Sequence, residues 1–514
     1  MFGRSEKEPK SSLDSSQAGF SFYTTLCVVI ACIVSFNNGW NTSDTNIIQA
    51  SIIDCDYPDE KVDGFPRCFP MGNWMWGFAV SSFSIGGAIG GLSAGWCQAK
   101  FGRRNSLLFN NIFFILGALL IGLSKNKGMW IVGRLFTGIG SGFGTVVLPT
   151  YIGEVSTTKV RGAYGAMTQL ACVIGQLVTQ AAGLGLSTRA GWRICLALTG
   201  AIAIAQLVTL SFITETPRYY ISKDRIEDAE KSLRKLRKGK DVTNELKSIV
   251  DARAEAKERG EQTSMMDGFR FIMKDPLTRK HAFLCVFLCI VQQLCGINGI
   301  MYYSTAIFTS IYGNKTAQYL TVGIGGINLI ATIVTILLID RVGRKILVLI
   351  SLAGMASFNV LMIIGIECND SGLVILGVFA FVVSFALGMG PIPFLIVSEL
   401  IPTRAVSTVA SCALGLNWFG NFVVGFFFPS LKDKMHGYVF LIFVFCCVVG
   451  FCGVLFFLPE TKGRSIEEIT GQHNNARAGE TPLQETTTPN VRSDADINQA
   501  ESSNAASSPV PNEI

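Results

Sequence analysis

The stretch FGRR at residues 101–104 returns as VGRK at residues 342–345, 241 positions further along the chain. Two more stretches return at nearly the same distance: GEVSTTKVRG (153–162) is echoed by SELIPTRAVS (398–407), and TETPR (214–218) by PETKGR (459–464). Both of these pairs are 245 positions apart. Three motifs repeated at nearly one spacing predict a chain that folds as two related halves, with any substrate site between them.

Each half contains six apolar runs separated by polar breaks. The chain of 514 residues is 49% hydrophobic and 16% charged, whereas soluble domains are about 25% charged. A run of roughly 20 apolar residues can cross a bilayer as a helix. The runs lie at residues 22–48, 73–99, 106–124, 129–151, 163–186, 192–213, 282–311, 319–339, 346–366, 373–397, 406–428 and 438–458. The predicted fold class is therefore an all-α polytopic membrane protein with twelve transmembrane helices in two six-helix halves.

The polar segments complete the predicted domain organisation. Residues 214–281 carry Lys, Arg and Glu at helical spacing, which predicts a cytosolic helical linker between bundles at 22–213 and 282–458. Basic residues at both ends of this linker place the centre and both termini in the cytosol. No cleavable signal peptide is evident. The remaining segments are expected to be a cytosolic N-terminus at 1–21, a cytosolic helix at 459–472 and a disordered tail at 473–514.

The composition excludes several classes of function. The net charge of +6 lies mostly in loops, as membrane topology requires, so it does not indicate a nucleic-acid partner. The histidines are scattered and most cysteines lie in apolar runs, so we expect no metal site, no cofactor and no enzyme. Cys55 and Cys68 share one polar loop, and we expect a disulfide between them if that loop is extracellular. The glycosylation sequons at Asn314 and Asn369 are expected on the extracellular side, as is the loop with Cys55.

Residues 291–303, VQQLCGINGIMYY, place three amides in an apolar run. A buried amide without a partner costs roughly 2–7 kcal/mol, so Gln292, Gln293 and Asn298 need a reason to be there. At about 100° per residue, Gln293 and Asn298 fall on opposite flanks of a straight helix. We therefore predict a break or kink in the region that Gly296 and Gly299 bracket, with the outer part of the helix acting as a gate together with Tyr302 and Tyr303. The alternative is that the amides only join neighbouring helices.

Nine motifs, taken together, resemble those of the sugar-porter branch of the major facilitator superfamily, and specifically the facilitative glucose transporters. They are FGRRNS, GRLFTGIGSGF, YIGEVSTTKVRG, TETPR, QQLCGIN, DRVGRK, GPIPF, NWFGNF and PETKGR. The likeness extends from about residue 22 to residue 470. It implies alternating access to one hexose site, with the sugar and the lipid bilayer as partners.

The resemblance implies that amides from both halves close around one sugar. An amide donates and accepts hydrogen bonds as a sugar hydroxyl does, without bringing a charge that is costly to desolvate. The implied sugar contacts are Gln169, Gln292, Gln293, Asn298, Asn328, Phe394, Asn417 and Asn421. Three positions depart from the glucose-transporter pattern, because Cys295 replaces a serine, Ala386 a glutamate and Phe394 a tryptophan. Phe394 can still stack on a sugar, whereas the side chain of Ala386 cannot hydrogen-bond.

Charged motifs occupy the predicted cytosolic helix ends. We expect inter-helix salt bridges there that hold the inner mouth shut in the outward-facing state and break as the halves rock. The arginines are Arg103, Arg161, Arg218, Arg344 and Arg404, and the acids are Glu154, Glu215, Asp340, Glu399 and Glu460. The alternative for any one of them is topological anchoring.

Proton coupling depends on one further position. Proton-coupled members of the resembled family carry an aspartate where Asn41 stands, facing an arginine that corresponds to Arg134. Asn41 cannot titrate, and we expect Asp44, one turn on, to be a solvated interfacial charge. The prediction is a facilitative hexose uniporter, for glucose first, in the plasma membrane. A proton-coupled symporter and a sugar sensor that does not transport are the alternatives, and the oligomeric state is left open.

Overall fold

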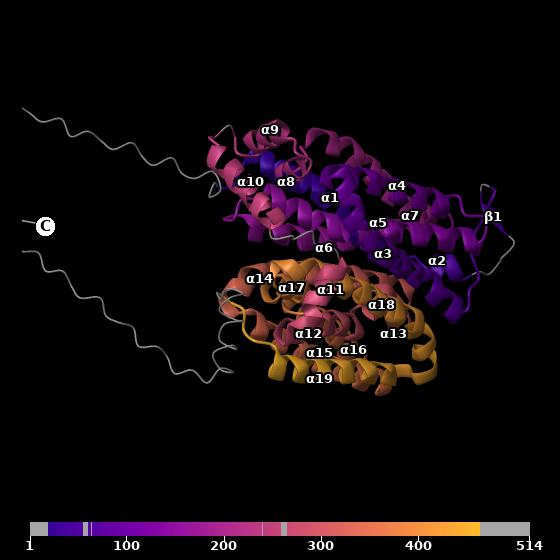
Figure 1. The fold of residues 1–514 in the computed structure, drawn as a ribbon. Helices are drawn as coiled ribbons and strands as arrows, with labels where there is room; N and C mark the ends of the chain where they lie inside the picture. The colour runs from indigo at the N-terminus through magenta and orange to yellow at the C-terminus, as the bar shows by residue number, and fades with distance from the viewer. Residues whose placement is uncertain (1–18, 55–59, 63, 239, 259–264, 463–514) are drawn as a thin grey trace, which may run out of the picture. The chain divides into compact units, whose positions relative to one another are not determined.

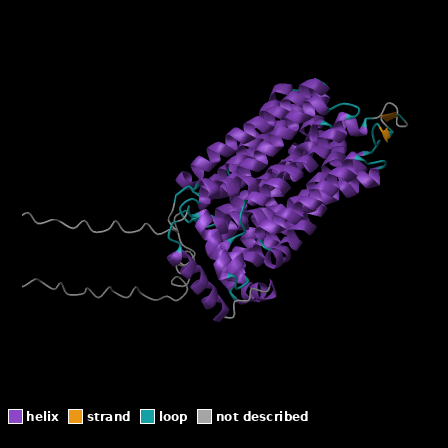
Figure 2. Ribbon diagram, turned by 90° about the horizontal axis from the view of Figure 1, so that it is seen from above, coloured by secondary structure: helices purple, strands orange, loops and turns teal. Residues whose placement is uncertain are grey.

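The computed structural model describes residues 19–54, 60–62, 64–238, 240–258 and 265–462, and Figure 1 shows their course. Most of them are helical, as Figure 2 shows. Within these residues, eleven helical stretches are long and apolar enough to span a membrane, and the last, Ala405–Phe457, contains two of the predicted helices. The predicted all-α polytopic fold is therefore confirmed. The predicted tail at 473–514 lies outside the described residues, as does most of the predicted helix at 459–472, of which residues 459–462 are not helical.

The first half contains six long helices. They are α1 (Phe22–Ile47), α3 (Asn73–Phe101), α4 (Arg103–Gly122), α5 (Lys127–Val155), α6 (Arg161–Leu186) and α7 (Gly191–Thr209), which the 3-10 turn η2 (Leu210–Phe212) follows. Between α1 and α3, the short helix α2 (Gln49–Ile53) leads into the antiparallel strands β1 (Lys61–Val62) and β2 (Phe65–Pro66). We call this end of the helices the hairpin end. Cys68 is disulfide-bonded beside it, but its expected partner Cys55 lies outside the described residues, so that pairing stays a prediction.

Four helices lie between the halves in sequence: α8 (Pro217–Ser222), α9 (Ile226–Leu236), α10 (Thr243–Glu258) and α11 (Met265–Lys274). In Figure 1, α8, α9 and α10 lie at the end of the first half opposite β1, which we call the insert end. Arg237, the residue after α9, holds α9 and α10 against α5, because it pairs with Glu245 at 2.7 Å and donates to the carbonyl of Val155, the last residue of α5, at 2.9 Å. The segment is therefore a packed helical insert rather than a free linker.

The second half repeats the pattern, with two of its spans divided. Its helices are α12 (Pro276–Leu294), α13 (Ile297–Tyr312), α14 (Asn314–Val342), α15 (Arg344–Glu367), α16 (Ser371–Leu387), α17 (Ile392–Leu400), α18 (Thr403–Met435) and α19 (Phe440–Phe457), with the 3-10 turn η3 (His436–Val439) before the last. The predicted break in the run at 282–311 is confirmed at residues 295–296. The run at 373–397 is divided as well, which the sequence analysis did not predict. Pro391 and Pro393 have no N–H to donate to the preceding turn, so a continuous helix is disfavoured there.

The two halves pack together along α3 and α18. A Cβ on Gly77 would lie 2.3 Å from the carbonyl oxygen of Phe426, so only glycine permits this approach. Further along, the rings of Phe83 and Trp418 meet edge to face with centroids 5.8 Å apart. At the hairpin end, the Asn73 side chain donates to the Asp433 carboxylate. The interface between the halves is thus closely packed at the hairpin end and around Trp418.

Candidate functional site

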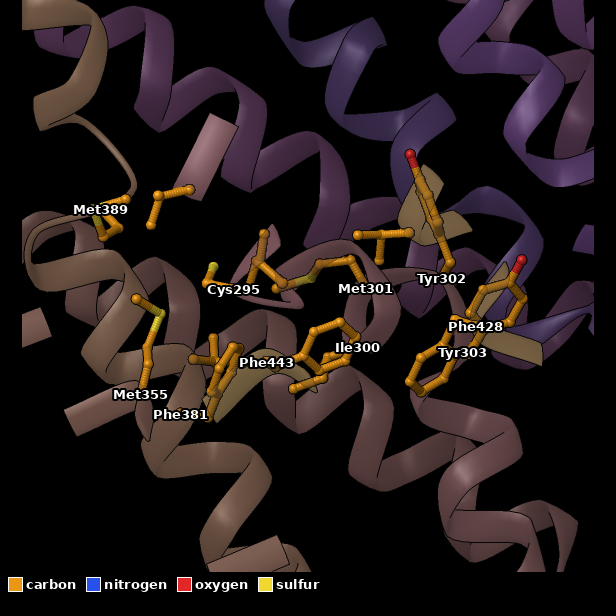
Figure 3. Packing of buried hydrophobic residues seen from close by; sticks show 14 of the residues in the cluster. Cys295, Ile300, Met301, Tyr302, Tyr303, Met355, Phe381, Met389, Phe428 and Phe443 are labelled. Atoms are coloured by element: carbon orange, nitrogen blue, oxygen red, sulfur yellow. The ribbon is translucent and has the colours of Figure 1, made fainter. Parts of the chain in front are cut away.

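The break between α12 and α13 depends on Gly296. Its φ is +99°, a left-handed backbone conformation that glycine adopts without steric cost. A Cβ at this position would also lie 2.5 Å from the ring of Phe443 on α19. Figure 3 shows Cys295 before the break and Met301, Tyr302 and Tyr303 beyond it. The glycine therefore separates a fixed part of the span from the part predicted to be a gate.

Four of the predicted sugar-contact amides form one buried network around this break. The amide of Gln292 donates to the carbonyls of Met389 and Gly390 at 2.6 and 2.9 Å, between α16 and α17. Asn417 on α18 donates to Gln292 Oε1 at 2.8 Å. Gln293 donates to Asn417 Oδ1 at 3.1 Å, and Asn298 donates to Gln293.

The break explains how two of these amides can meet. On a straight helix Gln293 and Asn298 lie on opposite flanks. The left-handed turn at Gly296 re-orients α13, and the two side chains hydrogen-bond across it. The network consequently spans the hinge and ties both of its sides to α18.

The two predicted gate tyrosines are also anchored on α18. Tyr302 donates to Asn421 Oδ1 at 2.9 Å, and Tyr303 donates to the carbonyl oxygen of Gly425 at 2.8 Å. Both side chains are buried, and the ring of Tyr303 stacks on that of Phe428 with centroids 5.6 Å apart. Asn421 thus binds a tyrosine of the predicted gate, while Asn417, one turn away, belongs to the amide network.

The remaining predicted contacts lie elsewhere. Asn328 on α14 is buried and donates to Gln176 Oε1 on α6 at 3.2 Å, which joins the two halves. Gln169, also on α6, is half-buried. Phe394 on α17 is 37% exposed.

Sequence reasoning missed two glutamines on α6. Gln176 binds Asn328, and Gln180 is buried, with an amide that has no hydrogen-bond partner among the described atoms. Both share a helix face with Gln169, since they follow it by seven and eleven residues. That spacing was the available signal.

The charged residues at the insert end pair within each half. Arg103 on α4 binds Glu154 on α5 at 2.7 Å, and Arg344 on α15 binds Glu399 on α17 at 3.1 Å. These are inter-helix pairs, but neither crosses from one half to the other. Arg161 and Arg218 are exposed and make no ion pair with the described residues. The side chains of Arg404 and Asp340 lie outside the described residues.

Glu215 and Glu460 act as helix caps rather than as arginine partners. Glu215 accepts the backbone N–H groups of residues 103–105 at 2.9–3.3 Å, which caps the N-terminus of α4. Glu460 accepts those of residues 344 and 345 at 2.9 and 3.2 Å, which caps α15 in the same way. A carboxylate at a helix N-terminus satisfies free N–H groups and complements the helix dipole. Burial raises the pKa of the Glu215 carboxyl, and its backbone N–H donors oppose the shift.

Asp44 is not the solvated interfacial charge that the sequence analysis expected. Its side chain is fully buried, and Arg134 Nη1 on α5 donates to both carboxylate oxygens at 2.9 Å. Arg134 Nη2 also donates to the carbonyl oxygen of Asn41 at 3.2 Å, and the guanidinium lies 4.9 Å from the centre of the Phe83 ring. Asn41 donates instead to Thr199 Oγ1 on α7 at 2.7 Å. The expectation failed because position along a helix does not reveal which neighbouring helix covers it.

Known proteins resemble the chain over most of its length. The family model "Sugar (and other) transporter" matches residues 26–472. The facilitated glucose transporter member 3 of solute carrier family 2 is 38% identical in Oryctolagus cuniculus, over 87% of this chain and 92% of the relative. The protein of the same name in Homo sapiens is 35% identical, over 89% of this chain and 95% of the relative.

Solved structures agree with this assignment. The partially occluded inward-open xylose transporter XylE from E. coli superposes with a TM-score of 0.71 at 25% identity, covering 87% of this chain and 100% of that one. The proton:xylose symporter XylE bound to 6-bromo-6-deoxy-D-glucose also gives 0.71 at 25% identity, covering 88% and 99%. The chain therefore belongs to the sugar transporter family: it is a multi-pass membrane transporter with the twelve-helix fold of the major facilitator superfamily, and not an enzyme.

Proposed function

We propose that this protein carries a hexose, with glucose as the first candidate, across the membrane by alternating access. The observation that carries the proposal is the amide network at the hinge of α12 and α13. Its members are neutral and offer both donors and acceptors, which is the chemistry of a sugar hydroxyl. They also lie in a membrane span, where polar groups are costly and are kept for a function.

The network supports a mechanism of exchange. Gln292, Gln293, Asn298 and Asn417 satisfy one another in the structure. A sugar that enters between the halves offers hydroxyls to the same donors and acceptors, so its binding replaces amide–amide bonds with amide–sugar bonds. Because the amides lie on both sides of Gly296, this replacement changes the contacts that hold α13. Substrate binding and gate movement are thereby coupled.

The contacts between the halves indicate which end of the transporter is closed. Asn73 with Asp433, and Gln318 Nε2 with Ser187 Oγ at 3.0 Å, join the halves at the hairpin end. We assign the hairpin end to the outside and the insert end, with both termini, to the cytosol, because the basic residues favour it. In that orientation the structure is closed toward the outside. The proposed location is the plasma membrane.

Uniport is the first proposal for the energetics. The relatives are named facilitated transporters, and Asn41 carries no proton that could couple transport to a gradient. Proton symport is a second candidate, because a specific observation favours it. The Asp44 carboxylate, which is buried against Arg134, is a proton acceptor inside a membrane span.

Uptake of labelled sugars separates these possibilities. Glucose, fructose, galactose and xylose are supplied to cells that lack their own hexose carriers, at two external pH values, with and without a protonophore. Uniport predicts uptake that the protonophore leaves unchanged and no accumulation of a non-metabolised analogue above the external level. Accumulation that collapses with the protonophore establishes symport. Binding without any flux rejects transport.

A further inference from the structure

The hairpin end of α1 reaches into the backbone of the gate helix α13. Asn46, one residue before the end of α1, is completely buried. Its Nδ2 donates to the carbonyl oxygen of Met301 at 2.7 Å and to Ser304 Oγ at 2.8 Å, and its Oδ1 accepts the backbone N–H of Thr305 at 3.1 Å. One side chain of the first half thus makes three contacts with α13 of the second half.

The two backbone groups are the members of a single helical pair. In an α-helix the N–H of residue 305 donates to the carbonyl of residue 301, four positions earlier. The Asn46 amide binds both of these groups at once, so it competes with that internal hydrogen bond. A side chain that enters the hydrogen-bond ladder in this way is a recognised cause of helix bending. The same two groups can be satisfied either by Asn46 or by each other.

The groups that Asn46 binds on α13 lie among other buried polar side chains. Ser304 and Thr305 also contact Thr321 on α14, with Thr305 Oγ1 and Thr321 Oγ1 2.8 Å apart. All of these groups are buried, so leaving any of them unpaired is costly. The residues directly before them on α13 are the gate tyrosines Tyr302 and Tyr303. Making or breaking the hydrogen bonds of Asn46 therefore affects the segment of α13 whose tyrosines bind Asn421 and Gly425.

We propose that Asn46 is the latch of the hairpin-end gate. It stabilises the closed gate by binding the Met301 carbonyl and the Thr305 N–H of α13, and when the halves separate at this end these two groups still have each other as helical partners. The helix thus loses no backbone hydrogen bond in either state, which lowers the cost of switching. This inference rests on the proposed alternating access. It identifies Asn46 as a positioning residue that favours the state in which the hairpin end is closed.

The test is the rate at which a thiol reagent labels a cysteine placed between the halves. Ser81 on α3 is completely buried, and its Cβ lies 3.2 Å from where a Cβ on Gly425 of α18 would be, so Ser81→Cys reports separation of the halves. Purified Ser81→Cys protein is compared with the same protein carrying Asn46→Leu, after subtraction of the labelling without the added cysteine. Loss of the latch hydrogen bonds is expected to raise the labelling rate about tenfold.

A matched control is Asn37→Leu. Asn37 is another fully buried amide on α1, but it bonds Thr199 within its own half, with Nδ2 donating to the Thr199 carbonyl at 3.1 Å. If Asn46 only stabilised the fold, both leucine variants would raise labelling equally, and that outcome overturns the latch. If Asn46→Leu does not fold, Ser304→Ala decides: a rise of about threefold supports the latch, and no rise overturns it. Uptake by the unaltered chain is a separate measurement, so a failed latch and a failed transport function are distinguishable.

Discussion

The first helix of each half carries polar residues in an apolar run, but the two helices use them differently. The helix α1 is continuous, and its buried Asn37, Asn41 and Asp44 bind α7 and α5 of their own half. The corresponding span of the second half is broken at Gly296, and its amides bind α18 and the α16–α17 turn across the break. Asn37, Asn41 and Asp44 hold the first half together, and only Asn46, near the end of α1, binds α13 among the four. The amides of α12 and α13 surround the break, where the proposed mechanism has them exchange partners. A break in a helix thus lets its buried amides bind each other across the break and also bind two neighbouring segments of the chain.

The largest effect is expected from removing the buried ion pair that joins α1 to α5 within the first half. Asp44→Asn leaves Arg134 buried without its carboxylate, and breaking a buried pair costs about 3–5 kcal/mol of folding free energy. We expect a lower melting temperature in detergent and less protein at the cell surface. The double variant Asp44→Asn/Arg134→Met removes both charges and should recover most of the stability. A single variant as stable as the unaltered protein would contradict the structural role of the pair.

The next largest effect is expected from replacing the glycine at the break between α12 and α13. Gly296→Ala places a Cβ in a left-handed conformation, at about 1–2 kcal/mol, and against Phe443, at about 1–3 kcal/mol more. We expect a large loss of sugar uptake together with a lower melting temperature. Gly299→Ala is the matched control, because that glycine is helical and its Cβ would lie 3.3 Å from the Phe428 ring. Equal effects at the two glycines would argue against a hinge at Gly296.

A third prediction sharpens the comparison at the amides. Gln292→Ala should weaken sugar binding by about 1–3 kcal/mol and leave surface expression intact, since it removes a proposed hydrogen-bonding partner of the sugar. The measurement is the concentration dependence of uptake. Gln206→Ala is the control, because Gln206 is a buried amide that binds the carbonyls of Ile30 and Ala31 on α1. Unchanged kinetics in Gln292→Ala would mean that the amides only join helices.

The smallest expected effect concerns a feature that the two halves share. Glu215→Ala and Glu460→Ala each remove a helix cap, which costs about 0.5–2 kcal/mol. The two losses should be similar, because the caps of α4 and α15 have the same geometry, and thermal unfolding measures both. The glutamine variants retain an acceptor oxygen and should recover most of the stability. A large difference between the halves would show that one carboxylate has a second role.

Several features of the fold follow from local sequence. Apolar length located the spans, and the conflict between helical spacing and the amides at 292, 293 and 298 predicted a break in the region of Gly296 and Gly299, which the structure places at residues 295–296. The second division, after Leu387, was missed even though the GMGPIPF stretch contains two prolines. The prolines lie within a run of apolar residues, which by itself predicts one helix. Hydropathy alone does not show that a proline lacks the N–H needed to continue a helix.

Other features depend on residues far apart in the chain. The sequence indicated that Asp44 and Arg134 are charged, but not that they are 2.9 Å apart and fully buried. It paired Glu215 and Glu460 with arginines, whereas both carboxylates accept backbone N–H groups of helices more than a hundred residues away. Nothing in the sequence joined Asn46 to Met301 and Thr305.

The chain alone therefore specifies the number of spans, the duplication, the family and the hinge, because transfer into a membrane, helical periodicity and the conformational freedom of glycine are local properties. The tertiary structure specifies which partner satisfies each buried polar group. The reason is that a hydrogen bond depends on positions in space to within a few tenths of an ångström. Those positions are set by how helices from both halves pack, which no local pattern encodes.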